Sequence, residues 1–456
     1  MKCYQEGYPR PQFVRGRGSW KSLDGVWNFC FDDGDEGRRG EWFRDFPGGR
    51  TINVPFTYEY PASGIGDSER HDAVWYQRDL EIGREPEGLR IFLHFEGCDY
   101  HTRLWVNGAF AGEHRGAYAR FSFDITDLVR QGKNSITVRA EDSFDTGQSR
   151  GKQRWRNENF GCWYLQNTGI WKSVWLEYAP QTRIAGVKMT PLLSKGTLEL
   201  EAELAGETEG LSFTARVSFQ GDEVSKTTVP ATGKRLRLSV DVNSPSLCEW
   251  GIRTWSPERP DLYDIGFSLE RDGKTVDQAL SYFGMREIRI EGARVTLNNQ
   301  PLYQRLILDQ GYWKESGITP PDEQALITDI DRVMAAGYNG VRKHQKIEDE
   351  RFLYWADVKG LLVWSEAAAA YEFTDAALSG FTREWMEIVQ QNYNHPSIIT
   401  WTPFNESWGV AQVKTDPAQQ HFTQAIYHLT KSYDPSRPVI CNDGWEHTVS
   451  DIITLH

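Results

Sequence analysis

Residues 395–407 read HPSIITWTPFNES, an apolar, β-branched run that ends in asparagine and glutamate. A run of this composition favours a buried strand. Trp385 and Ile388 belong to a helical stripe before it, and Phe422 and Ile426 belong to another after it. A buried strand between two amphipathic helices is typical of a parallel sheet with helical crossovers.

The same alternation extends over residues 289–456. Helical patterns separate five strand-like runs, at residues 306–308, 340–342, 361–364, 398–401 and 438–440, and a sixth run follows at 452–454. A (β/α)8 barrel needs eight strands. The sequence therefore predicts the N-terminal part of a TIM barrel, truncated after about strand six.

Two regions that read as all-β precede this alternation. Residues 1–180 contain short β-branched and aromatic runs separated by turn signals, such as Asn107-Gly108, which favours a tight hairpin. Residues 181–288 contain strictly alternating runs, for example at 198–204 and 236–242. These patterns predict a jelly-roll sandwich followed by an immunoglobulin-like sandwich.

Composition excludes several functional classes. The 456 residues include 51 Lys and Arg against 64 Asp and Glu, a net charge of −13, which argues against nucleic acid or an anionic membrane as a partner. The first residues, MKCYQEGYPRPQF, lack the apolar stretch of a secretory signal, and no run is long enough for a membrane helix. The six cysteines are scattered, which favours reduced thiols. We expect a cytoplasmic protein, with secretion still open if a signal was removed.

Polar side chains follow the strand-like runs in the barrel region. In a βα barrel, functional groups lie where the strands end. The residues at these positions are Asp309, Arg342, His344, Glu366, Asn405, Glu406, Trp408 and Asp443. Carboxylates, a histidine, an arginine and aromatic residues on one rim suit general acid/base work on a polyhydroxylated substrate.

The stretch 395–407 resembles a strand of glycoside hydrolase family 2, which includes β-galactosidases, β-glucuronidases and β-mannosidases. In that family, the strand delivers an Asn-Glu pair at the end of barrel strand four. Further family motifs occur in order along the chain. The sugar-binding jelly roll of the family is resembled by residues 20–27, 54–56, 74–76, 105–108, 123–126 and 169–171. The end of its immunoglobulin-like domain is resembled by residues 255–263, and the join to the barrel by residues 283–286 and 297–301. The resemblance implies domains at 1–180, 181–288 and 289–456.

The resemblance also implies roles for individual residues. Glu406 is the expected general acid/base, and Asn405 is expected to hydrogen-bond the sugar 2-hydroxyl. Apolar walls from Trp401, Phe404 and Trp408 are expected to raise the pKa of the acid. The family's nucleophile is a Glu after strand seven, so no nucleophile is assigned within these residues. The possible substitutes are Asp443, Glu446 and Glu366, which are better interpreted as rim hydrogen-bonding or salt-bridge groups.

The sequence departs from the family pattern at two strand ends. His344 lies one place earlier than the family's histidine, so a substrate role competes with a surface position or a bond to Glu348. Ser365 and Ala368 replace a common Asp and Asn around Glu366, which weakens any transfer of galactose specificity. Tyr371, Tyr312 and Trp313 are expected to line the subsite or to pack in the core. The loop at 145–159 is expected to reach the active site or to be solvated.

These observations leave several functions open. The leading hypothesis is a retaining exo-β-glycosidase, β-galactosidase-like, with β-glucuronidase as the alternative within the family. A non-catalytic carbohydrate-binding fragment is the second hypothesis, and a metal-dependent hydrolase using His344, Asp309 and Glu366 is a weaker third. We expect no cofactor or metal, a carbohydrate partner and possible homo-oligomers. The 456 residues alone are expected to be inactive and poorly soluble, because an incomplete barrel exposes sheet edges.

Overall fold

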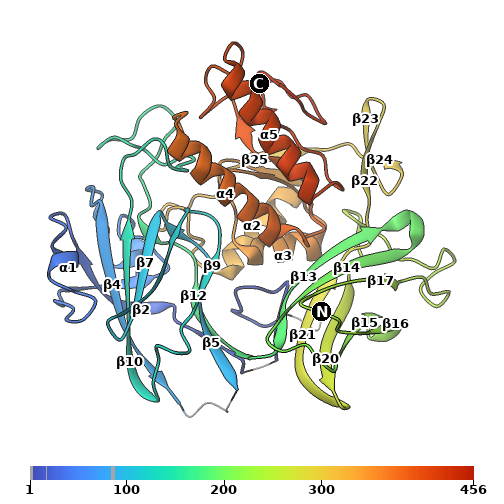
Figure 1. Ribbon diagram of the computed structural model, residues 1–456. Helices are drawn as coiled ribbons and strands as arrows, with labels where there is room; N and C mark the ends of the chain where they lie inside the picture. Colours follow the sequence, from blue (N-terminus) through green and yellow to red (C-terminus); the bar gives the residue numbers. More distant parts are fainter. Residues whose placement is uncertain (1–3, 17, 84–87) are drawn as a thin grey trace.

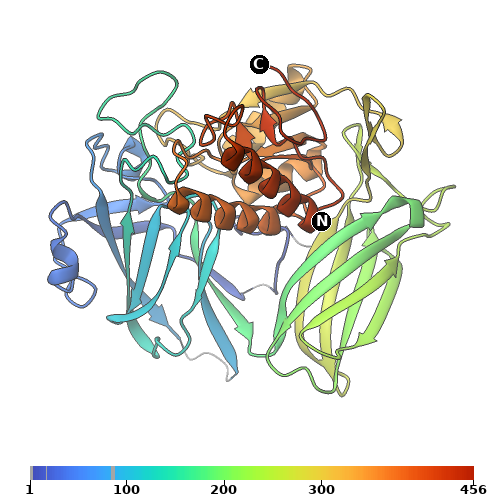
Figure 2. The same ribbon diagram turned by 45° about the horizontal axis from the view of Figure 1, so that its top comes forward.

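The computed structural model describes residues 4–16, 18–83 and 88–456. Two β-sandwiches lie side by side, and a unit of parallel strands and helices lies across both of them (Figures 1 and 2). Among the described residues, no helix is both long and apolar enough to cross a bilayer. Cys30, Cys98, Cys162, Cys248 and Cys441 are free thiols, and Cys3 lies outside the described residues.

The first sandwich consists of two antiparallel sheets with strand orders β1-β12-β5-β9 and β3-β2-β4-β10-β7-β8. Its hairpin at Asn107-Gly108 is confirmed, because both residues have positive φ, at 52° and 78°. Its elements are β1 (Trp20–Ser22), β2 (Gly25–Phe31), α1 (Glu36–Arg39), β3 (Arg50–Val54), β4 (Ala73–Ile82), β5 (Leu89–Phe95), β6 (Cys98–Asp99), β7 (His101–Val106), β8 (Ala109–Arg115), β9 (Phe121–Asp124), β10 (Gly132–Glu141), β11 (Gly169–Ile170) and β12 (Val174–Pro180).

The second sandwich pairs the sheet β13-β14-β17 with the sheet β16-β15-β20-β21. The predicted alternation is visible in β17, whose even-numbered residues are buried and odd-numbered residues exposed. Its strands are β13 (Arg183–Leu192), β14 (Thr197–Ala205), β15 (Leu211–Phe219), β16 (Asp222–Pro230), β17 (Arg235–Asp241), β18 (Trp255–Ser256), β19 (Arg259–Pro260), β20 (Tyr263–Arg271) and β21 (Lys274–Phe283). A small antiparallel sheet of β22 (Ile288–Glu291), β23 (Arg294–Leu297) and β24 (Gln300–Pro301) leads on to the third unit.

The third unit contains a parallel sheet in the order β25-β26-β27-β28, followed by a parallel pair, β29 and β30. Each long helix begins at a side chain that accepts a hydrogen bond from its first turn, namely Asp322, Asp349, Thr374 or Asp416. The elements are β25 (Leu306–Asp309), α2 (Glu323–Ala335), β26 (Gly340–Lys343), α3 (Glu350–Lys359), β27 (Leu362–Glu366), α4 (Asp375–Asn392), β28 (Ile398–Thr402), β29 (Phe404–Asn405), α5 (Pro417–Tyr433) and β30 (Asn442–Asp443).

The predicted sixth strand over residues 452–454 is wrong, because these residues form no strand. The predicted fifth strand over residues 438–440 is also wrong, because only Val439 pairs there, in a single β-bridge with Trp401, and β30 begins at Asn442. Residues 451–456 run beside this segment, where the Asp451 amide donates to Val439 O at 3.0 Å. Elsewhere along this segment, backbone N–H groups bond to side-chain hydroxyls and not to backbone carbonyls. Ser450 Oγ accepts from Cys441 N, and Thr454 Oγ1 accepts from Gly444 N. A backbone whose partners are bonded to side chains cannot form a regular ladder.

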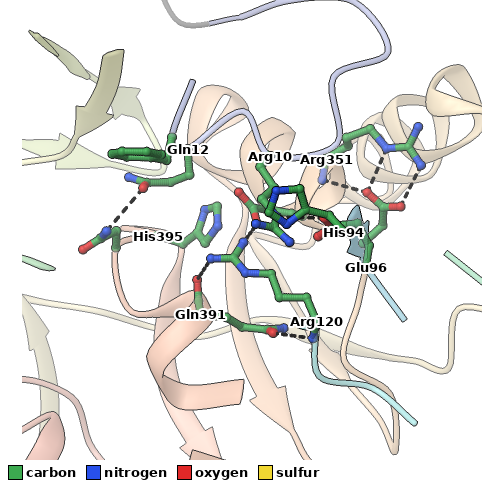
Figure 3. Close-up of polar contacts among 12 residues, drawn as sticks. Arg10, Gln12, His94, Glu96, Arg120, Arg351, Gln391 and His395 are labelled. Atoms are coloured by element: carbon green, nitrogen blue, oxygen red, sulfur yellow. Dashed lines mark hydrogen bonds and ion pairs between the residues drawn. The ribbon is translucent and has the colours of Figure 1, made fainter. Parts of the chain in front are cut away.

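The N-terminal segment joins the three units through buried charges and amides. Arg10 Nε donates to Glu96 of the first sandwich at 2.7 Å, and Gln12 Oε1 accepts from Asn394 of the barrel unit at 3.3 Å (Figure 3). Arg120, from the first sandwich, contacts Gln391 on α4, where its amide donates to the Gln391 side chain at 2.9 Å. These bonds cross between units, so they fix the first sandwich against the barrel unit.

Arg15 links the two sandwiches, and its removal is expected to destabilise the protein. The side chain is 5% exposed and pairs with Glu177 of the first sandwich and Asp277 of the second. Replacing it by methionine leaves two carboxylates without their cation, which typically costs about 3–5 kcal/mol. Arg15→Met should lower the free energy of unfolding by that amount in denaturant titrations. Arg216→Met, which removes an exposed pair with Glu223, should cost about 1 kcal/mol or less. Equal losses would contradict the role of Arg15.

Candidate active site

Parallel strands bring the predicted polar residues to one edge of the sheet. Asp309, Lys343 and Glu366 are the last residues of β25, β26 and β27, and Asn405 and Asp443 end β29 and β30. Parallel strands share the edge at which their carboxyl ends lie, so residues far apart in sequence become neighbours there. The sequence prediction of a shared rim rests on this topology, and the strand order supports it.

Arg342 is the centre of this edge. Its Nε donates to Glu366 Oε2 at 2.8 Å and lies 2.7 Å from Asp443 Oδ2, and its Nη2 donates to Asn405 Oδ1. Glu366 and Asp443 are 0% and 2% exposed. Two buried carboxylates beside one guanidinium form an ion-pair network that holds Asn405 in one orientation. We call Arg342, Glu366, Asn405 and Asp443 the floor.

Asn405 has an unused donor. Because Arg342 donates to its Oδ1, the amide nitrogen Nδ2 is left over, and this buried atom has no hydrogen-bond partner within the described part of the chain. A buried donor without a partner is costly, and a bound molecule can supply the missing acceptor. The sequence prediction that Asn405 bonds a sugar hydroxyl is compatible with this geometry.

Glu406 follows the floor on a turn of left-handed backbone, with φ of 50°. Its amide donates to Asp443 O at 2.9 Å, and its carboxylate, 30% exposed, lies 2.7 Å from His456 Nδ1. Partial burial raises the pKa of Glu406, but the hydrogen bond and charge of His456, together with the charge of Lys152, outweigh it and hold the pKa below its ordinary value.

The expected apolar walls around Glu406 are wrong for two of three residues. Trp401 donates its Nε1 to Asp434 at 2.8 Å, and Phe404 stacks on Phe381 at 4.9 Å, so both belong to the core between sheet and helices. Only Trp408 interacts with the carboxylate. The expected rise in the pKa of Glu406 is therefore absent, because polar neighbours replace the apolar ones.

His456 is expected to control the ionisation of Glu406. In His456→Gln the charge that lowers the pKa of Glu406 is lost, so this pKa should rise, while His421→Gln, on the exposed side of α5, should leave it unchanged. Because the pKa of Glu406 is lower in the folded protein than in the unfolded chain, Glu406 stabilises the fold at pH values above its unfolded pKa. This contribution is lost as the pH falls through the folded pKa. Carboxyl carbon NMR titration measures the shift. An unchanged Glu406 titration in His456→Gln would contradict the assignment.

Asp309 and His344 lie on the same edge with different partners. Asp309 pairs with Lys343 at 2.6 Å, and Lys343 also pairs with Glu348. His344 Nδ1 lies 2.8 Å from Glu366 Oε1 but without the angles of a hydrogen bond. The alternative of a surface His344 is therefore wrong, because the side chain is 5% exposed, and in place of a bond to Glu348 it faces Glu366.

The metal-dependent alternative receives no support from this arrangement. Asp309 is neutralised by Lys343, whereas Glu366 is bound by Arg342. Across residues 4–16, 18–83 and 88–456, no group of three His, Cys, Asp or Glu side chains is arranged to hold a metal ion.

Gln345 is a site residue that the sequence analysis did not single out. Its backbone N–H donates to Glu366 Oε1 at 3.1 Å, and its side-chain Oε1 accepts from Ala369 N at 2.7 Å. Its Nε2 is buried and lacks a partner in the described residues, as Asn405 Nδ2 does. The signal was available, because His344 lies one place early and Gln345 therefore stands at the position of the family's histidine.

The loop between β10 and β11 reaches the site from the first sandwich. Arg150 N and Gly151 N donate to Ala369 O at 2.9 and 3.1 Å, and Tyr371 N donates to Thr146 O at 2.7 Å. Residues 148–154 are buried, so the alternative of a merely solvated loop is wrong for this part. Gly151 is required here, because a Cβ would lie 2.4 Å from Gln345 O.

The loop also delivers a cation and aromatic rings. Lys152 is 6% exposed, and the one hydrogen-bond partner of its Nζ among the described residues is Cys162 Sγ at 3.3 Å. Trp155 and Trp163 lie 4.4 and 5.6 Å from Tyr371 between ring centroids, and Trp163 lies 5.4 Å from Trp408. Tyr371 and Trp408, predicted to bind substrate, are thus brought together beside Glu406.

Comparison with known families explains this combination of two sandwiches and a parallel strand unit. Three profiles of one family match in order: the sugar-binding domain at residues 20–180, the family 2 glycosyl hydrolase domain at 182–286, and the TIM-barrel domain at 288–455. The chain belongs to glycosyl hydrolase family 2. The resemblance inferred from the sequence is confirmed.

Individual family 2 relatives are distant in sequence. A β-galactosidase of Leuconostoc mesenteroides is 27% identical over 95% of this chain and 43% of its own length. A β-glucuronidase of Canis lupus familiaris is 24% identical over 96% of this chain and 70% of its own length. The chain spans about half the length of the bacterial relatives it matches.

Solved structures share the fold. The β-glucuronidase of Ruminococcus gnavus superimposes with a TM-score of 0.79 at 21% identity, covering 96% of this chain and 74% of that one. A β-glucuronidase of an uncultured Clostridium species gives 0.79 at 19% identity, covering 97% and 75%. At these identities the likeness establishes the fold alone.

Proposed function

We propose that this family 2 protein hydrolyses β-linked glycosides with retention of configuration, and that Glu406 is the general acid/base. The observation that carries the proposal is the Asn405-Glu406 pair at the sheet edge. Arg342 orients Asn405 so that Nδ2 is free to meet a sugar hydroxyl, and the next residue carries the half-exposed carboxylate. A hydroxyl contact beside a proton donor is what glycosidic cleavage requires.

Glu406 has two tasks in a retaining mechanism. It first protonates the leaving-group oxygen and later takes a proton from water. The contact with His456 favours the ionised form, which suits the second task. A substrate that displaces His456 would remove its hydrogen bond and charge, raise the pKa of Glu406 and so favour the protonated form needed for the first task.

The nucleophile is proposed to be a carboxylate outside residues 1–456. A retaining enzyme needs a second carboxylate about 5–5.5 Å from the acid. Glu366 and Asp443 are both buried beside Arg342, which suits structural ion pairs, and Glu446 contacts Ser407 Oγ at 3.5 Å. We call the gene product that supplies this carboxylate the complete enzyme.

The sugar is proposed to be galactose, in line with the β-galactosidase names of the Leuconostoc and Klebsiella relatives. One observation favours glucuronic acid as the second candidate. Lys152 is a buried cation near Glu406 without a carboxylate partner in the described residues, and an acidic sugar would supply one.

Comparison of aryl β-galactoside and aryl β-glucuronide hydrolysis by the complete enzyme tests both candidates. If Lys152 binds a uronate, Lys152→Met should reduce kcat/KM for the glucuronide by about 10-fold or more and leave the galactoside within about twofold, because a charged hydrogen bond contributes about 1.5–3 kcal/mol. Lys414→Met, an exposed lysine, is the control. Equal losses on both sugars would remove the case for glucuronic acid, hydrolysis of neither sugar would refute both sugar assignments, and hydrolysis of no aryl β-glycoside would refute the proposed function.

A further inference from the structure

Five aromatic side chains from three segments gather beside Glu406. Trp155, Phe160 and Trp163 come from the β10–β11 loop, Tyr371 follows β27, and Trp408 follows β29. Neighbouring ring centroids lie 4.4–5.6 Å apart, within the range of direct ring contact. We call these five residues the aromatic wall.

The wall has a defined geometry. Trp163 Nε1 donates to Tyr371 Oη at 2.7 Å, and Tyr371 Oη donates to Gly151 O. Trp163 N donates to Phe160 O at 2.9 Å, which closes the tip of the loop. The rings are therefore held by polar bonds at their edges and not only by contact with one another.

The wall is not part of a hydrophobic core. All five rings are partly exposed, whereas core tryptophans of this protein such as Trp27 and Trp75 are at most 1% exposed. Burying a large aromatic side chain is strongly favourable, so rings that are held in place and left partly open present apolar surface to a ligand. Because these rings lie next to the candidate catalytic carboxylate of Glu406, the ligand that they contact is expected to be part of the substrate.

The position of the wall relative to Glu406 identifies what it would contact. The floor residues Arg342, Asn405 and Glu366 lie at the strand ends and are at most 8% exposed. The wall lies on loops beyond the strand ends, and Trp408 interacts with the Glu406 carboxylate. A glycoside whose cleaved sugar meets the floor extends outward past Glu406. The part that lies past Glu406 is the leaving group, since the acid protonates the oxygen between the two.

We propose that the aromatic wall is a leaving-group subsite, and that the natural leaving group is a six-membered ring that presents an apolar face. An aryl group and a pyranose both have this chemistry, because the axial C–H groups of a sugar form an apolar face that packs on aromatic rings. The proposal rests on the proposed glycosidase function and adds the class of leaving group. It also gives the first sandwich a part in substrate choice, because its loop supplies three of the five rings.

Binding of uncleavable thioglycosides to the 456-residue chain tests the proposal by calorimetry. The probes are methyl and phenyl 1-thio-β-galactosides, the matching thioglucuronides, and thiodigalactoside. Ring stacking contributes about 0.5–1.5 kcal/mol, so the phenyl ligand of the preferred sugar should bind about 2- to 10-fold tighter than the methyl ligand. Thiodigalactoside carries a sugar in the leaving-group position. If the subsite accepts a sugar ring, thiodigalactoside should bind about 2- to 10-fold tighter than the methyl thiogalactoside; if it accepts only an aryl ring, this gain in affinity should be absent.

Three variants locate the effect. Trp163→Ala should abolish the advantage of the phenyl ligand, Trp163→Phe should restore most of it, and Trp250→Ala, 84% exposed on the second sandwich, should not change it. Equal affinity for phenyl and methyl ligands in both sugar series, or no binding of any probe, overturns the subsite. If Asn405→Ala weakens all probes while the phenyl advantage is absent, the subsite fails and the proposed function stands. If the phenyl advantage depends on Trp163 but the complete enzyme hydrolyses no glycoside, the subsite stands and the proposed function fails.

Discussion

Replacing Glu406 by glutamine is expected to slow the complete enzyme by about 10²–10⁴-fold on glycosides with poor leaving groups, the range typical of a lost general acid. Substrates with good leaving groups, such as dinitrophenyl glycosides, need little protonation and should lose much less in the cleavage step. Glutamine keeps the size of the side chain and its partial exposure, so the floor should remain intact. The measurement is kcat/KM across a series of aryl glycosides of increasing leaving-group pKa.

The informative quantity is the slope of log kcat/KM against leaving-group pKa. It should be steep in Glu406→Gln and shallow in the parent enzyme. In the variant the leaving group departs without protonation, so the cleavage rate depends on the stability of the leaving group as an anion. Glu158→Gln, an exposed carboxyl on the loop of the aromatic wall, is the control and should keep the parent slope. A uniform loss across the series would contradict the acid role and indicate a role in binding or folding.

Replacing Arg342 by methionine is expected to have the second largest effect, on both stability and activity. The change leaves Glu366 and Asp443 buried without their cation and removes the donor that orients Asn405. Removal of one partner from a buried pair costs about 3–5 kcal/mol, and a reoriented Asn405 would no longer present Nδ2 to the sugar. Denaturant unfolding measures the first effect, and binding of a thioglycoside measures the second.

Arg342→Lys separates charge from geometry. Lysine restores a cation but lacks the planar fork that reaches Glu366, Asp443 and Asn405 together, so stability should recover more than binding. Arg332→Met, on the exposed side of α2, should change neither. Parent-like stability in Arg342→Met would contradict the proposed role of Arg342 in stabilising the two buried carboxylates.

Much of the site could be predicted, because parallel topology alone gathers strand-end residues. Asp309, Arg342, Glu366 and Asn405 follow recognisable strands, and the strand order places them on one edge. Gln345 was missed, although its position next to His344 carried a signal. Lys152 belongs to the loop at 145–159, for which the sequence left two alternatives open, and His456 had no signal. The proximity of both residues to Glu406 depends on how a long loop and a non-strand segment fold back.

The predicted environment of Glu406 was wrong for a related reason. Trp401 and Phe404 are close to Glu406 in sequence, but they lie in β28 and β29, whereas Glu406 follows β29 on a turn with φ of 50°, so the alternation of a strand does not continue to Glu406. The structure directs both into the core against Trp385 and Phe381. Sequence proximity therefore did not predict which side chains share a solvent-accessible space with the carboxylate.

The sequence by itself determined the family, the order of two sandwiches and a parallel unit, and the Asn405-Glu406 pair. These features depend on local periodicity and short motifs, which are properties of consecutive residues. Only the tertiary structure decided that a loop of the first sandwich brings Lys152 and three aromatic rings to Glu406, and that residues 452–454 form no strand. Those outcomes depend on hydrogen bonds between residues that are not neighbours in the chain, such as Gly151 N to Ala369 O and Gly444 N to Thr454 Oγ1, and no local pattern encodes such bonds.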